Sequence, residues 1–472
     1  MRRIIVIGGG ISGLSALHRL LEIRSERELP IEVSLLEAGD RVGGVISTVY
    51  KDGFVIERGP DSFLTSKPEL IGLCKRIGLG DDIIPTNAAH RRTFVVRDGS
   101  LLPVPEGFML LAPTEFLPFL TSSVFSWPGK LRILMDLLLP RKRGSGDESL
   151  ASFVRRRFGS EALDRVAQPM ISGIYAADPE RLSVSLTMPR FIQMEERFGS
   201  VIRGMLAEKR LSKKGKREGE SGARYGLIVS LRRGMQSLVD ALLLRIPEGT
   251  ISLNRRVESV TQAGGGWAVS TVDGVSYKAD AVIIAAPSYA ASKLAGGIDP
   301  SLSKDLGEIE YASTAVVNLA FDREDIRHRL DGFGFVVPAA EGRAIIACSF
   351  TSVKFSERAP EGKALFRCFI GGALNPGAYS MDDDSMLSTV LAELDSLLGV
   401  RSEPLFSLIC RHPASMPQYA VGHLDHFAQI RNTLSNYPTL RLAGNAYSGI
   451  GTPDCVRSGE GAAEEVVKSL FS

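Results

Sequence analysis

The chain of 472 residues is longer than a single hydrophobic core organises, so we expect two or more domains. Its hydrophobic content of 44% and charged content of 23% are those of an ordinary globular protein and exclude a disordered chain. The formal net charge of +2 excludes binding of nucleic acid by bulk electrostatic attraction.

The cysteines and the N-terminus bear on the compartment and on metal binding. The five cysteines form no Cys-x-x-Cys pair; they are Cys74, Cys348, Cys368, Cys410 and Cys455. This spacing argues against a disulfide framework and a zinc site, and His423 and His426 lack further ligands beside them in the sequence, so we expect no metal. The residues after Met1 run directly into a strand, so we expect no signal peptide and a cytoplasmic protein.

The first 37 residues predict a parallel βαβ unit that binds a dinucleotide. Residues 2–7 and 31–36 are apolar runs typical of buried strands, and residues 12–23 have helical periodicity. Gly8, Gly10 and Gly13 stand where the first strand turns into the helix, so the helix N-terminus faces the phosphates. Glu37, at the end of the second strand, can accept hydrogen bonds from ribose hydroxyls.

The residues that follow distinguish FAD from NAD. They read Glu-Ala-Gly-Asp-Arg-Val-Gly-Gly over 37–44, with Thr48 beyond. Arg41 can offset the charge of a pyrophosphate, and Gly43 and Gly44 let the backbone close over the ligand. This extended pattern resembles the FAD-binding signature of the amine oxidase and phytoene desaturase superfamily, and the predicted cofactor is therefore FAD.

A helical region follows from residue 105 to about 203, with a capping-type start at 147–149. Its longest charge-free apolar run, 116–129, is too short to span a bilayer. Two interpretations remain open for this part: a buried pair of helices, or a monotopic patch that dips into a lipid surface. Basic residues at 141–143 and 155–157 would then meet anionic headgroups. Residues 209–220, nearly all charged or small, predict an exposed loop.

The second half of the chain predicts two blocks of strands and then a return to the first pattern. Strand character occurs at 251–260, 267–272, 275–278 and 281–285, and again at 315–321, 334–337, 343–350 and 365–371. A helix is predicted at 383–398, and the last segment has a strand at 440–443 and a helix at 454–470. We therefore expect the nucleotide-binding domain to be closed by its own C-terminus.

Four motifs spread along the chain resemble the protoporphyrinogen oxidase family, a branch of the flavin amine oxidase superfamily. They are Phe-Val-Ile-Glu-Arg-Gly-Pro-Asp-Ser-Phe-Leu at 54–64, Ile-Ser-Gly-Ile-Tyr-Ala-Ala-Asp at 171–178, Ser-Met-Pro-Gln-Tyr at 415–419 and Gly-Ile-Gly-Thr-Pro-Asp-Cys at 449–455. Within this family the chain is most similar to the soluble type of Gram-positive bacteria that acts as coproporphyrinogen III oxidase.

The resemblance implies an α/β fold with three parts. A Rossmann-like FAD-binding domain of the p-hydroxybenzoate hydroxylase type would be discontinuous, over residues 1–75, 224–295 and 425–472. A mixed-sheet substrate-binding domain would take residues 76–104 and 296–424. A helical insertion over 105–215 would be the part able to associate with a membrane.

The resemblance also implies which residues hold FAD. Those expected at the pyrophosphate and ribose are Gly8, Gly10, Ile11, Ser12, Gly13, Glu37, Ala38, Arg41, Gly43 and Gly44. Those expected along the isoalloxazine are Gly59, Pro60, Asp61 and Ser62, with Val257 at the adenine. Gly444, Thr452, Pro453 and Asp454 would complete the site, where the N-terminus of the last helix favours the negative charge of reduced flavin.

The reaction that the resemblance implies is oxidation of coproporphyrinogen III to coproporphyrin III in haem biosynthesis, with O2 as acceptor and H2O2 as product. The flavin performs the redox step, so we expect no catalytic side chain. The alternatives are oxidation of protoporphyrinogen IX, or a flavin amine oxidase or carotenoid desaturase. An amine oxidase would usually show an aromatic cage near Gly444, where the chain offers only Tyr447. A haem-pathway enzyme and a lipid surface are the further partners considered.

A macrocycle with propionates would fit an apolar slot with basic residues at its rim. Lys67, Arg91 and Arg190 are candidates for that rim, and Tyr175 lies in the second motif. His412 stands where the family pattern commonly has Trp, three residues before the Ser-Met-Pro-Gln-Tyr stretch. It is either a proton acceptor near the substrate or an ordinary packed or exposed histidine.

Overall fold

The apolar runs near the N-terminus form a parallel sheet with strands from two later segments of the chain. The strand order is β12-β2-β1-β16-β22, with β1 at Arg2–Ile7, β2 at Ile31–Leu36, β12 at Ile251–Ser252, β16 at Ala281–Ile284 and β22 at Leu440–Leu442. β1 pairs in parallel with β2, with Ile4 opposite Val33. The predicted βαβ unit is confirmed, and the C-terminal segment returns to the same sheet.

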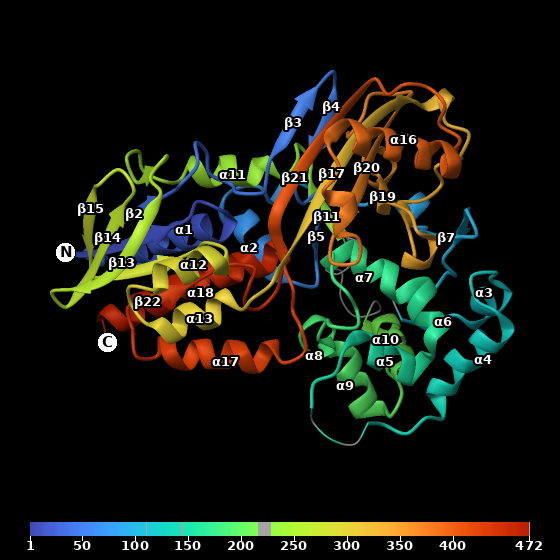
Figure 1. Cartoon of the computed structure of the whole chain (residues 1–472), viewed down its shortest axis with the longest axis horizontal. Coiled ribbons are helices and arrows are strands. Elements are labelled where there is room, and N and C mark those ends of the chain that lie inside the picture. Colours follow the sequence, from blue (N-terminus) through green and yellow to red (C-terminus); the bar gives the residue numbers. More distant parts are fainter. Residues whose placement is uncertain (110, 143, 145, 216–227, 472) are drawn as a thin grey trace.

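The computed structural model describes residues 1–471 except 110, 143, 145 and 216–227 (Figure 1). Both termini and the five-stranded sheet lie at one end of the molecule, and a seven-stranded sheet and the helical region lie at the other (Figure 1). The division of the chain into domains by residue number stays a prediction. No helix in the described part of the chain is long and apolar enough to cross a bilayer.

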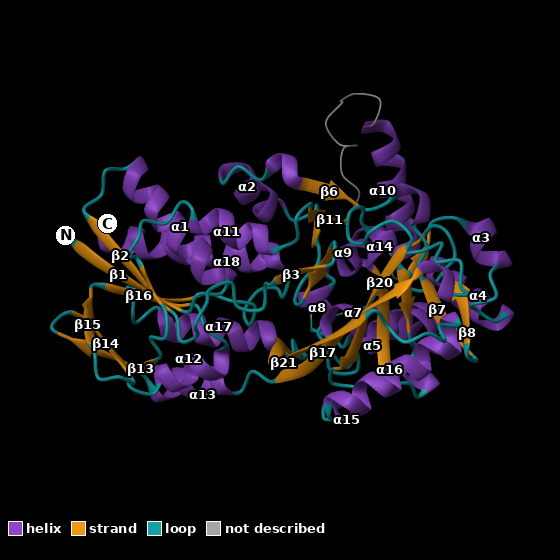
Figure 2. Ribbon diagram, turned by 90° about the horizontal axis from the view of Figure 1, so that it is seen from above, coloured by secondary structure: helices purple, strands orange, loops and turns teal. Residues whose placement is uncertain are grey.

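Helices cover both faces of the five-stranded sheet (Figure 2). On one face Ile4 and Val6 pack with α1 (Ile11–Glu26), α11 (Gln236–Leu243) and α18 (Thr452–Phe471). On the other face Ile5 and Ile7 pack with α12 (Ser288–Ala295), α13 (Pro300–Gly307) and α17 (His423–Leu434). A strand buried on both faces must be apolar at every position, which is why residues 4–7 are a continuous apolar run. The antiparallel strands β13 (Val257–Ala263), β14 (Gly266–Thr271) and β15 (Ser276–Ala279) extend this layer.

The seven-stranded sheet is mixed, as expected. Its order is β21-β17-β20-β19-β18-β7-β8, with β7 at Phe94–Arg97, β8 at Ser100–Pro103, β17 at Tyr311–Asp322, β18 at Gly334–Val336, β19 at Ile345–Phe350, β20 at Lys363–Gly371 and β21 at Phe406–Pro417. Only β18 and β7 pair in parallel among its described strands. The predicted helix 383–398 is confirmed as α16 (Asp383–Leu398), which packs on this sheet.

The helical prediction for 105–203 is confirmed except for a short hairpin of β9 (Phe108–Met109) and β10 (Ala112–Pro113). The helices are α3 (Phe116–Thr121), α4 (Trp127–Leu134), α5 (Leu150–Phe158), α6 (Ser160–Ala162), α7 (Gln168–Tyr175), α8 (Val184–Thr187), α9 (Pro189–Phe198) and α10 (Val201–Gly215), with the turns η3 (Met135–Leu137) and η4 (Leu163–Ala167). The predicted cap is present, because the Ser149 side chain accepts a hydrogen bond from the N–H of Ser152. This layer packs under the seven-stranded sheet against Val336 and Ala347.

Two sequence predictions are wrong in part. Residues 209–215 were expected in a loop but continue α10, because Lys, Arg and Leu favour helix once the preceding turns are anchored in the core; residues 216–220 lie outside the described chain. The strand expected over 251–260 is two strands, β12 and β13. Between them the chain bends at Asn254 (φ +54°) to bond the loop after β2.

Short elements lie between the longer strands and helices. They are β3 (Thr48–Lys51), β4 (Phe54–Glu57), β5 (Phe63–Leu64), α2 (Pro68–Arg76), η1 (Gly80–Asp82), β6 (Ile83–Pro85), η2 (Ala88–His90), β11 (Ile228–Leu231), η5 (Arg323–Asp325), η6 (Ala339–Glu341), α14 (Thr351–Lys354) and α15 (Pro376–Tyr379). The segment between β4 and β5 lies along the seven-stranded sheet, whose side chains His412 and Arg367 bond its carbonyls, and the candidate site lies along this segment.

Candidate functional site

The turn between β1 and α1 leaves open space in front of the helix. Gly8 has φ +105°, and a Cβ at this position would lie 2.5 Å from the carbonyl oxygen of Ala285, so only glycine fits. Gly10 is the N-cap of α1 and offers no side chain to its first N–H groups. A Cβ at Gly10 would meet nothing within 4 Å. Unfilled space before uncapped helical N–H groups suits a phosphate, and the residues therefore fit the pyrophosphate of FAD.

A second loop closes over the first. The N–H of Gly43 donates to the carbonyl of Gly9 at 2.8 Å, and a Cβ at Gly44 would lie 3.2 Å from the Cα of Gly10. Arg41 donates to the carbonyls of Val42, Ile46 and Gly44, so it holds the loop in shape here. Its expected contact with the pyrophosphate stays a prediction.

Glu37 lies beside the same turn. Its carboxylate accepts the N–H of Gly9 at 2.5 Å and that of Gly39 at 2.7 Å. The carbonyl of Glu37 accepts the N–H of Arg255, which brings the chain just before Val257 beside this loop. The structure therefore brings Glu37 and Val257 to one end of the turn, where the ribose and adenine were expected.

The helices α1 and α18 run in the same direction. Gly459 packs on the backbone of Ser12, and Glu464 accepts a hydrogen bond from Arg19 at 3.1 Å, so residue numbers rise together along both helices. Since α1 begins one residue before Ser12 and α18 begins seven before Gly459, the start of α18 lies about 9 Å beyond that of α1. Two positive helix ends thus follow one another along the site.

Asp454, in the first turn of α18, is buried with 1% of its surface exposed. Its carboxylate forms an ion pair with Lys67, whose side chain is partly exposed, and accepts a hydrogen bond from Arg457 at 2.8 Å. It also accepts the N–H of Gly451 at 3.2 Å. Lys67 and the Thr452–Asp454 turn, predicted from separate motifs, are therefore brought together.

Two tyrosines from separate motifs lie near this carboxylate. The hydroxyl of Tyr419 donates to the carbonyl of Asn445 and accepts the N–H of Gly449, so it fixes the loop before α18. Burial raises the pKa of Tyr419 well above its ordinary value. Burial and, secondarily, the charge of Asp454 raise the pKa of Tyr175 to about 12. Both side chains are therefore neutral phenols at physiological pH.

The segment 59–62 is held from behind by charged side chains that the sequence analysis missed. Lys354 lies 3.0 Å from the carboxylate of Asp61, and Arg367 lies 3.3 Å from it and also donates to the carbonyl of Gly59. Burial alone would raise the pKa of Asp61, but the charges of Lys354 and Arg367 outweigh it and hold that pKa well below its usual range. No local sequence signal could identify these partners, since they lie about 300 residues away.

Two cavities lie on the seven-stranded sheet side of the site, and the smaller one borders this segment at Arg58. The smaller, about 280 Å³, is lined by residues of the loop 41–47, including Arg41 and Gly44, and by Arg58 and His412. Nε2 of His412 lies 2.7 Å from the carbonyl of Arg58; since a carbonyl only accepts, Nε2 carries the proton. Burial lowers the pKa of His412. Its role as a proton acceptor stays a prediction, with Nδ1 the ring nitrogen left for it.

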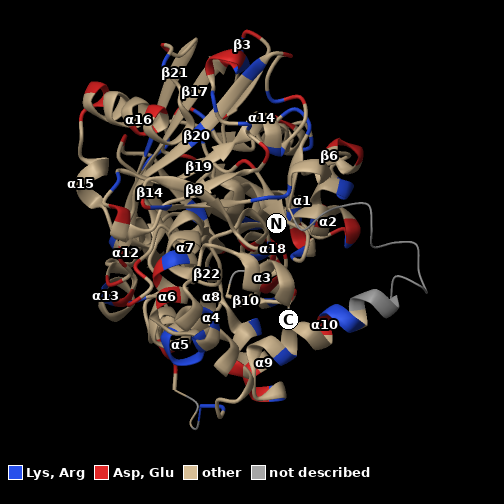
Figure 3. Cartoon of the chain, turned by 90° about the vertical axis from the view of Figure 1, so that its right-hand side faces the viewer, with Lys and Arg blue, Asp and Glu red and all other residues tan. Residues whose placement is uncertain are grey.

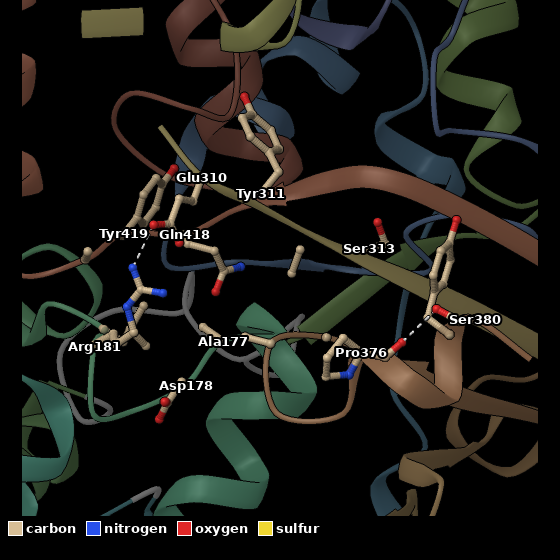
Figure 4. Close-up of a pocket in the computed structure, with 16 residues that line it drawn as sticks. Ala177, Asp178, Arg181, Glu310, Tyr311, Ser313, Pro376, Ser380, Gln418 and Tyr419 are labelled. Carbon is tan, nitrogen blue, oxygen red and sulfur yellow. Dashed lines mark hydrogen bonds and ion pairs between the residues drawn. The ribbon is translucent and has the colours of Figure 1, made fainter. Parts of the chain in front are cut away.

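The larger cavity, about 530 Å³, lies where the loop after α7 meets the ends of β17, β20 and β21 (Figure 4). Tyr311, Gln418 and Tyr419 contribute to its wall, and Arg181 and Glu310 form an ion pair of 2.9 Å at it (Figure 4). Arg91 and Arg190 line neither cavity: Arg91 is exposed after η2, and Arg190 pairs with Glu208 on the helical layer. Their assignment to a propionate rim stays a prediction.

His426 has neighbours that its sequence does not show. Asp305 and Glu308, at the end of α13, bring carboxylate oxygens within 4.8 Å of its ring nitrogen and of each other. The expectation that His423 and His426 lack clustered ligands is therefore wrong for His426. His423 instead bonds the carbonyl of Ala446 at 3.0 Å.

Comparison with known proteins agrees with this geometry. A family model described as flavin containing amine oxidoreductase matches residues 11–467. The chain is 34% identical to the coproporphyrinogen III oxidase of Bacillus subtilis, over 100% of this chain and 99% of that protein. It is 35% identical to the coproporphyrinogen III oxidase of Staphylococcus aureus, over 99% and 100%. A crystal structure named for a protoporphyrinogen oxidase of Exiguobacterium sp. 255-15 superposes with a TM-score of 0.86 at 30% identity, covering 100% and 99%.

The cofactor is FAD, as predicted from the extended pattern at 37–44, and the α/β fold is that of FAD-dependent oxidoreductases. The match extends over nearly the whole chain and so includes both helix ends and both cavities. The chain is an enzyme of the flavin containing amine oxidoreductase family.

Proposed function

We propose that this enzyme oxidises coproporphyrinogen III to coproporphyrin III in haem biosynthesis, with O2 as the acceptor and H2O2 as the product. The observation that carries the proposal is that three motifs meet at the start of α18: Lys67, just after the first motif, pairs with Asp454 of the last, and Tyr419 of the third bonds the loop before Asp454. The names of the Bacillus subtilis and Staphylococcus aureus relatives, which match along their full length, support this substrate.

We assign the cofactor site to the predicted residues. When bound, FAD accepts the electrons that each oxidation removes from the macrocycle. The pyrophosphate would occupy the space before Gly10, and Glu37 would hold the ribose. The isoalloxazine would then lie along Gly59 to Ser62 and meet the positive end of α18 at Thr452, where the dipole favours the negative charge that reduction adds.

The chain's own residues bind and orient the substrate. Lys67 is partly exposed beside the start of α18, so its ammonium can pair with a propionate while its other bond holds Asp454. Tyr175 and Tyr419 present neutral rings with tied hydroxyls, which form a wall without abstracting protons. A site of this kind positions a macrocycle and excludes water, and leaves the redox step to the flavin.

Anaerobic mixing tests the proposal directly. Coproporphyrinogen III added to the FAD-loaded enzyme without O2 is expected to bleach the visible absorbance of the flavin, and readmitted O2 is expected to restore it with release of H2O2. Protoporphyrinogen IX, suggested by the name of the Exiguobacterium structure, is the competing substrate. The proposal fails if coproporphyrinogen III gives no bleaching or if protoporphyrinogen IX gives the higher kcat/KM; an amine that bleaches the flavin would identify an amine oxidase instead.

We also propose that α4 touches a lipid surface. Trp127, Leu131, Met135 and Leu138 follow one another at helical spacing along α4, η3 and the residue after η3, and all four are exposed, Leu138 by 83%. We call these four residues the α4 apolar face. Figure 3 looks onto this end of the molecule and marks the Lys and Arg positions of the neighbouring α5 and α10. The arginines of α5 pair with carboxylates, and Arg157 is buried, whereas Arg203 and Arg210 of α10 are exposed. An exposed apolar stripe with exposed cations on a neighbouring helix suits the surface of a membrane with anionic headgroups.

A further inference from the structure

A group of buried charges lies behind the segment 57–62. It contains two carboxylates, Glu57 and Asp61, and three cations, Lys354, Arg358 and Arg367. Glu57, Arg358 and Arg367 are at most 1% exposed, and the side chains of Asp61 and Lys354 are 14% exposed. Ionised side chains this deeply buried are costly unless they are paired, so their retention needs a reason.

The backbone of the segment is tied to the seven-stranded sheet at three consecutive carbonyls. Asn318 of β17 donates to the carbonyl of Glu57 at 3.3 Å, His412 of β21 donates to that of Arg58 at 2.7 Å, and Arg367 of β20 donates to that of Gly59. The strands β21, β17 and β20 are neighbours in the sheet. The sheet therefore fixes this part of the backbone without using its N–H groups.

Two cations act on one carboxylate at the end of the segment. Lys354 Nζ lies 3.0 Å from Oδ2 of Asp61 and 3.2 Å from the hydroxyl of Ser62, and Arg367 reaches the same Oδ2 at 3.3 Å. The hydroxyl of Ser62 donates to the other oxygen of Asp61 at 2.8 Å. One of the two positive charges beside Asp61 is therefore not neutralised there.

The group as a whole has an excess of positive charge. Three cations face two carboxylates, and burial raises the pKa of Glu57, which favours its neutral form. The excess is therefore at least one unit. In a poorly hydrated interior a unit charge acts over a longer distance and with a larger energy than it does in water.

We propose that Lys354 and Arg367 are positioning residues that hold the segment 59–62 against the isoalloxazine and give its surroundings a net positive charge that raises the reduction potential of the flavin. The inference rests on the proposed function only in placing this segment beside the isoalloxazine. Reduction adds negative charge to the flavin, so a fixed positive charge nearby stabilises the reduced form more than the oxidised form. The negative charge of Asp61 partly cancels this positive charge. Removing the charge of Asp61 should therefore raise the reduction potential of the flavin.

The test is whether neutralising Lys354 and neutralising Asp61, the two partners of one ion pair, shift the midpoint potential of the flavin in opposite directions. The midpoint potential of the bound flavin is measured by spectroelectrochemical titration of the FAD-loaded enzyme without substrate. Lys354→Met is expected to lower the potential and Asp61→Asn to raise it, each changing the equilibrium constant of the two-electron reduction by about tenfold, or ~30 mV. The double variant, which restores the net charge, is expected to return toward the wild-type potential.

The chain offers a matched control. Lys363 of β20 and Asp322 of β17 form an ion pair at the edge of the same sheet that carries Arg367, but at the surface, where both side chains are about a third exposed. Lys363→Met and Asp322→Asn are expected to leave the potential within a few millivolts of wild type, because solvent screens exposed charges. Lys354→Arg, which keeps the charge, is expected to stay closer to wild type than Lys354→Met.

The inference is overturned if Lys354→Met and Asp61→Asn shift the potential in the same direction, or by no more than the control pair. Should the lysine variants not hold FAD, Asp61→Asn alone decides: a rise larger than that of Asp322→Asn supports the inference, and any other result overturns it. Since the measurement needs no porphyrinogen, its result is separate from the substrate assignment. Enzyme that bleaches with coproporphyrinogen III while both potentials stay unchanged would refute this inference alone.

Discussion

Gly459 of α18 packs directly on the carbonyl oxygen of Ser12 in α1, so closely that a Cβ at position 459 would overlap that oxygen. The contact sets the distance between two helices that run in the same direction. The N-termini of these helices face the two ends of the proposed flavin site. The contact between Gly459 and Ser12 therefore fixes the distance between the positive ends of the two helix dipoles. The absence of a side chain at Gly459 therefore lets the first and last helices of the chain pack in close contact.

Gly459→Ala is expected to lower the free energy of unfolding by about 1–3 kcal/mol, because the added methyl must push α1 and α18 apart. Urea denaturation and the fraction of FAD retained after gel filtration measure the effect. Gly461, two residues further along α18, is the control: a Cβ there would meet nothing within 4 Å. Gly461→Ala should stabilise by about 0.5–1 kcal/mol through helix propensity. Equal effects at both positions would mean that the helix contact is not close.

Lys67→Met is expected to raise KM for the porphyrinogen by about tenfold or more, which corresponds to the loss of one charge-assisted hydrogen bond to a propionate. Steady-state kinetics measure this change. The exposed Lys75 of α2 is the matched control, and Lys75→Met should leave KM unchanged. If Lys67 only supports the buried Asp454, the variant will instead lose thermal stability and FAD while KM stays constant.

His423 makes stability depend on pH. Burial lowers its pKa from 6.5 to about 4 in the folded chain, so between these values the unfolded chain binds the additional proton. Stability is therefore lost as the pH falls from 6.5 toward 4. Between pH 7 and pH 5 this group should contribute a loss of about 2 kcal/mol.

His423→Gln, whose amide can still donate to the carbonyl of Ala446, removes the titrating ring. The free energies of unfolding at pH 7 and pH 5, from urea denaturation, are expected to differ by about 2 kcal/mol less in this variant than in wild type. His90→Gln in η2 serves as the control and should keep the wild-type difference. A difference that His423→Gln leaves unaltered would show that the ring titrates normally in the folded chain.

The α4 apolar face gives a prediction for lipid binding. Replacing Leu131 and Leu138 with Gln is expected to weaken co-sedimentation with vesicles of anionic lipid by about tenfold or more, since each buried leucine contributes about 1.5–3 kcal/mol when fully removed from water. Leu244→Gln tests the specificity of the surface, because Leu244 is 89% exposed at the end of α11. Wild-type protein that stays in solution with anionic vesicles would remove the basis for this contact.

Only part of the candidate site could be predicted from the sequence. The turn at Gly8 to Gly13 and the strand ending before Glu37 were predictable, because both depend on contacts between residues fewer than 40 positions apart. The partners of Asp61 were not, because Lys354 and Arg367 reach it across about 300 residues and look like ordinary charges in the sequence. The strand β21 was missed for a related reason: it is a half-buried edge strand whose burial does not alternate.

The sequence by itself determined the nucleotide fold, the identity of the cofactor and the motifs of the enzyme family, because residue type at fixed local spacing decides where a backbone can turn and cap a phosphate. Only the tertiary structure decided which charges meet. It set α18 parallel to α1 through Gly459, brought Lys67 to Asp454, and placed an excess of buried cations behind Gly59. Such long-range pairs depend on strand register and helix packing, which no local pattern of residues specifies.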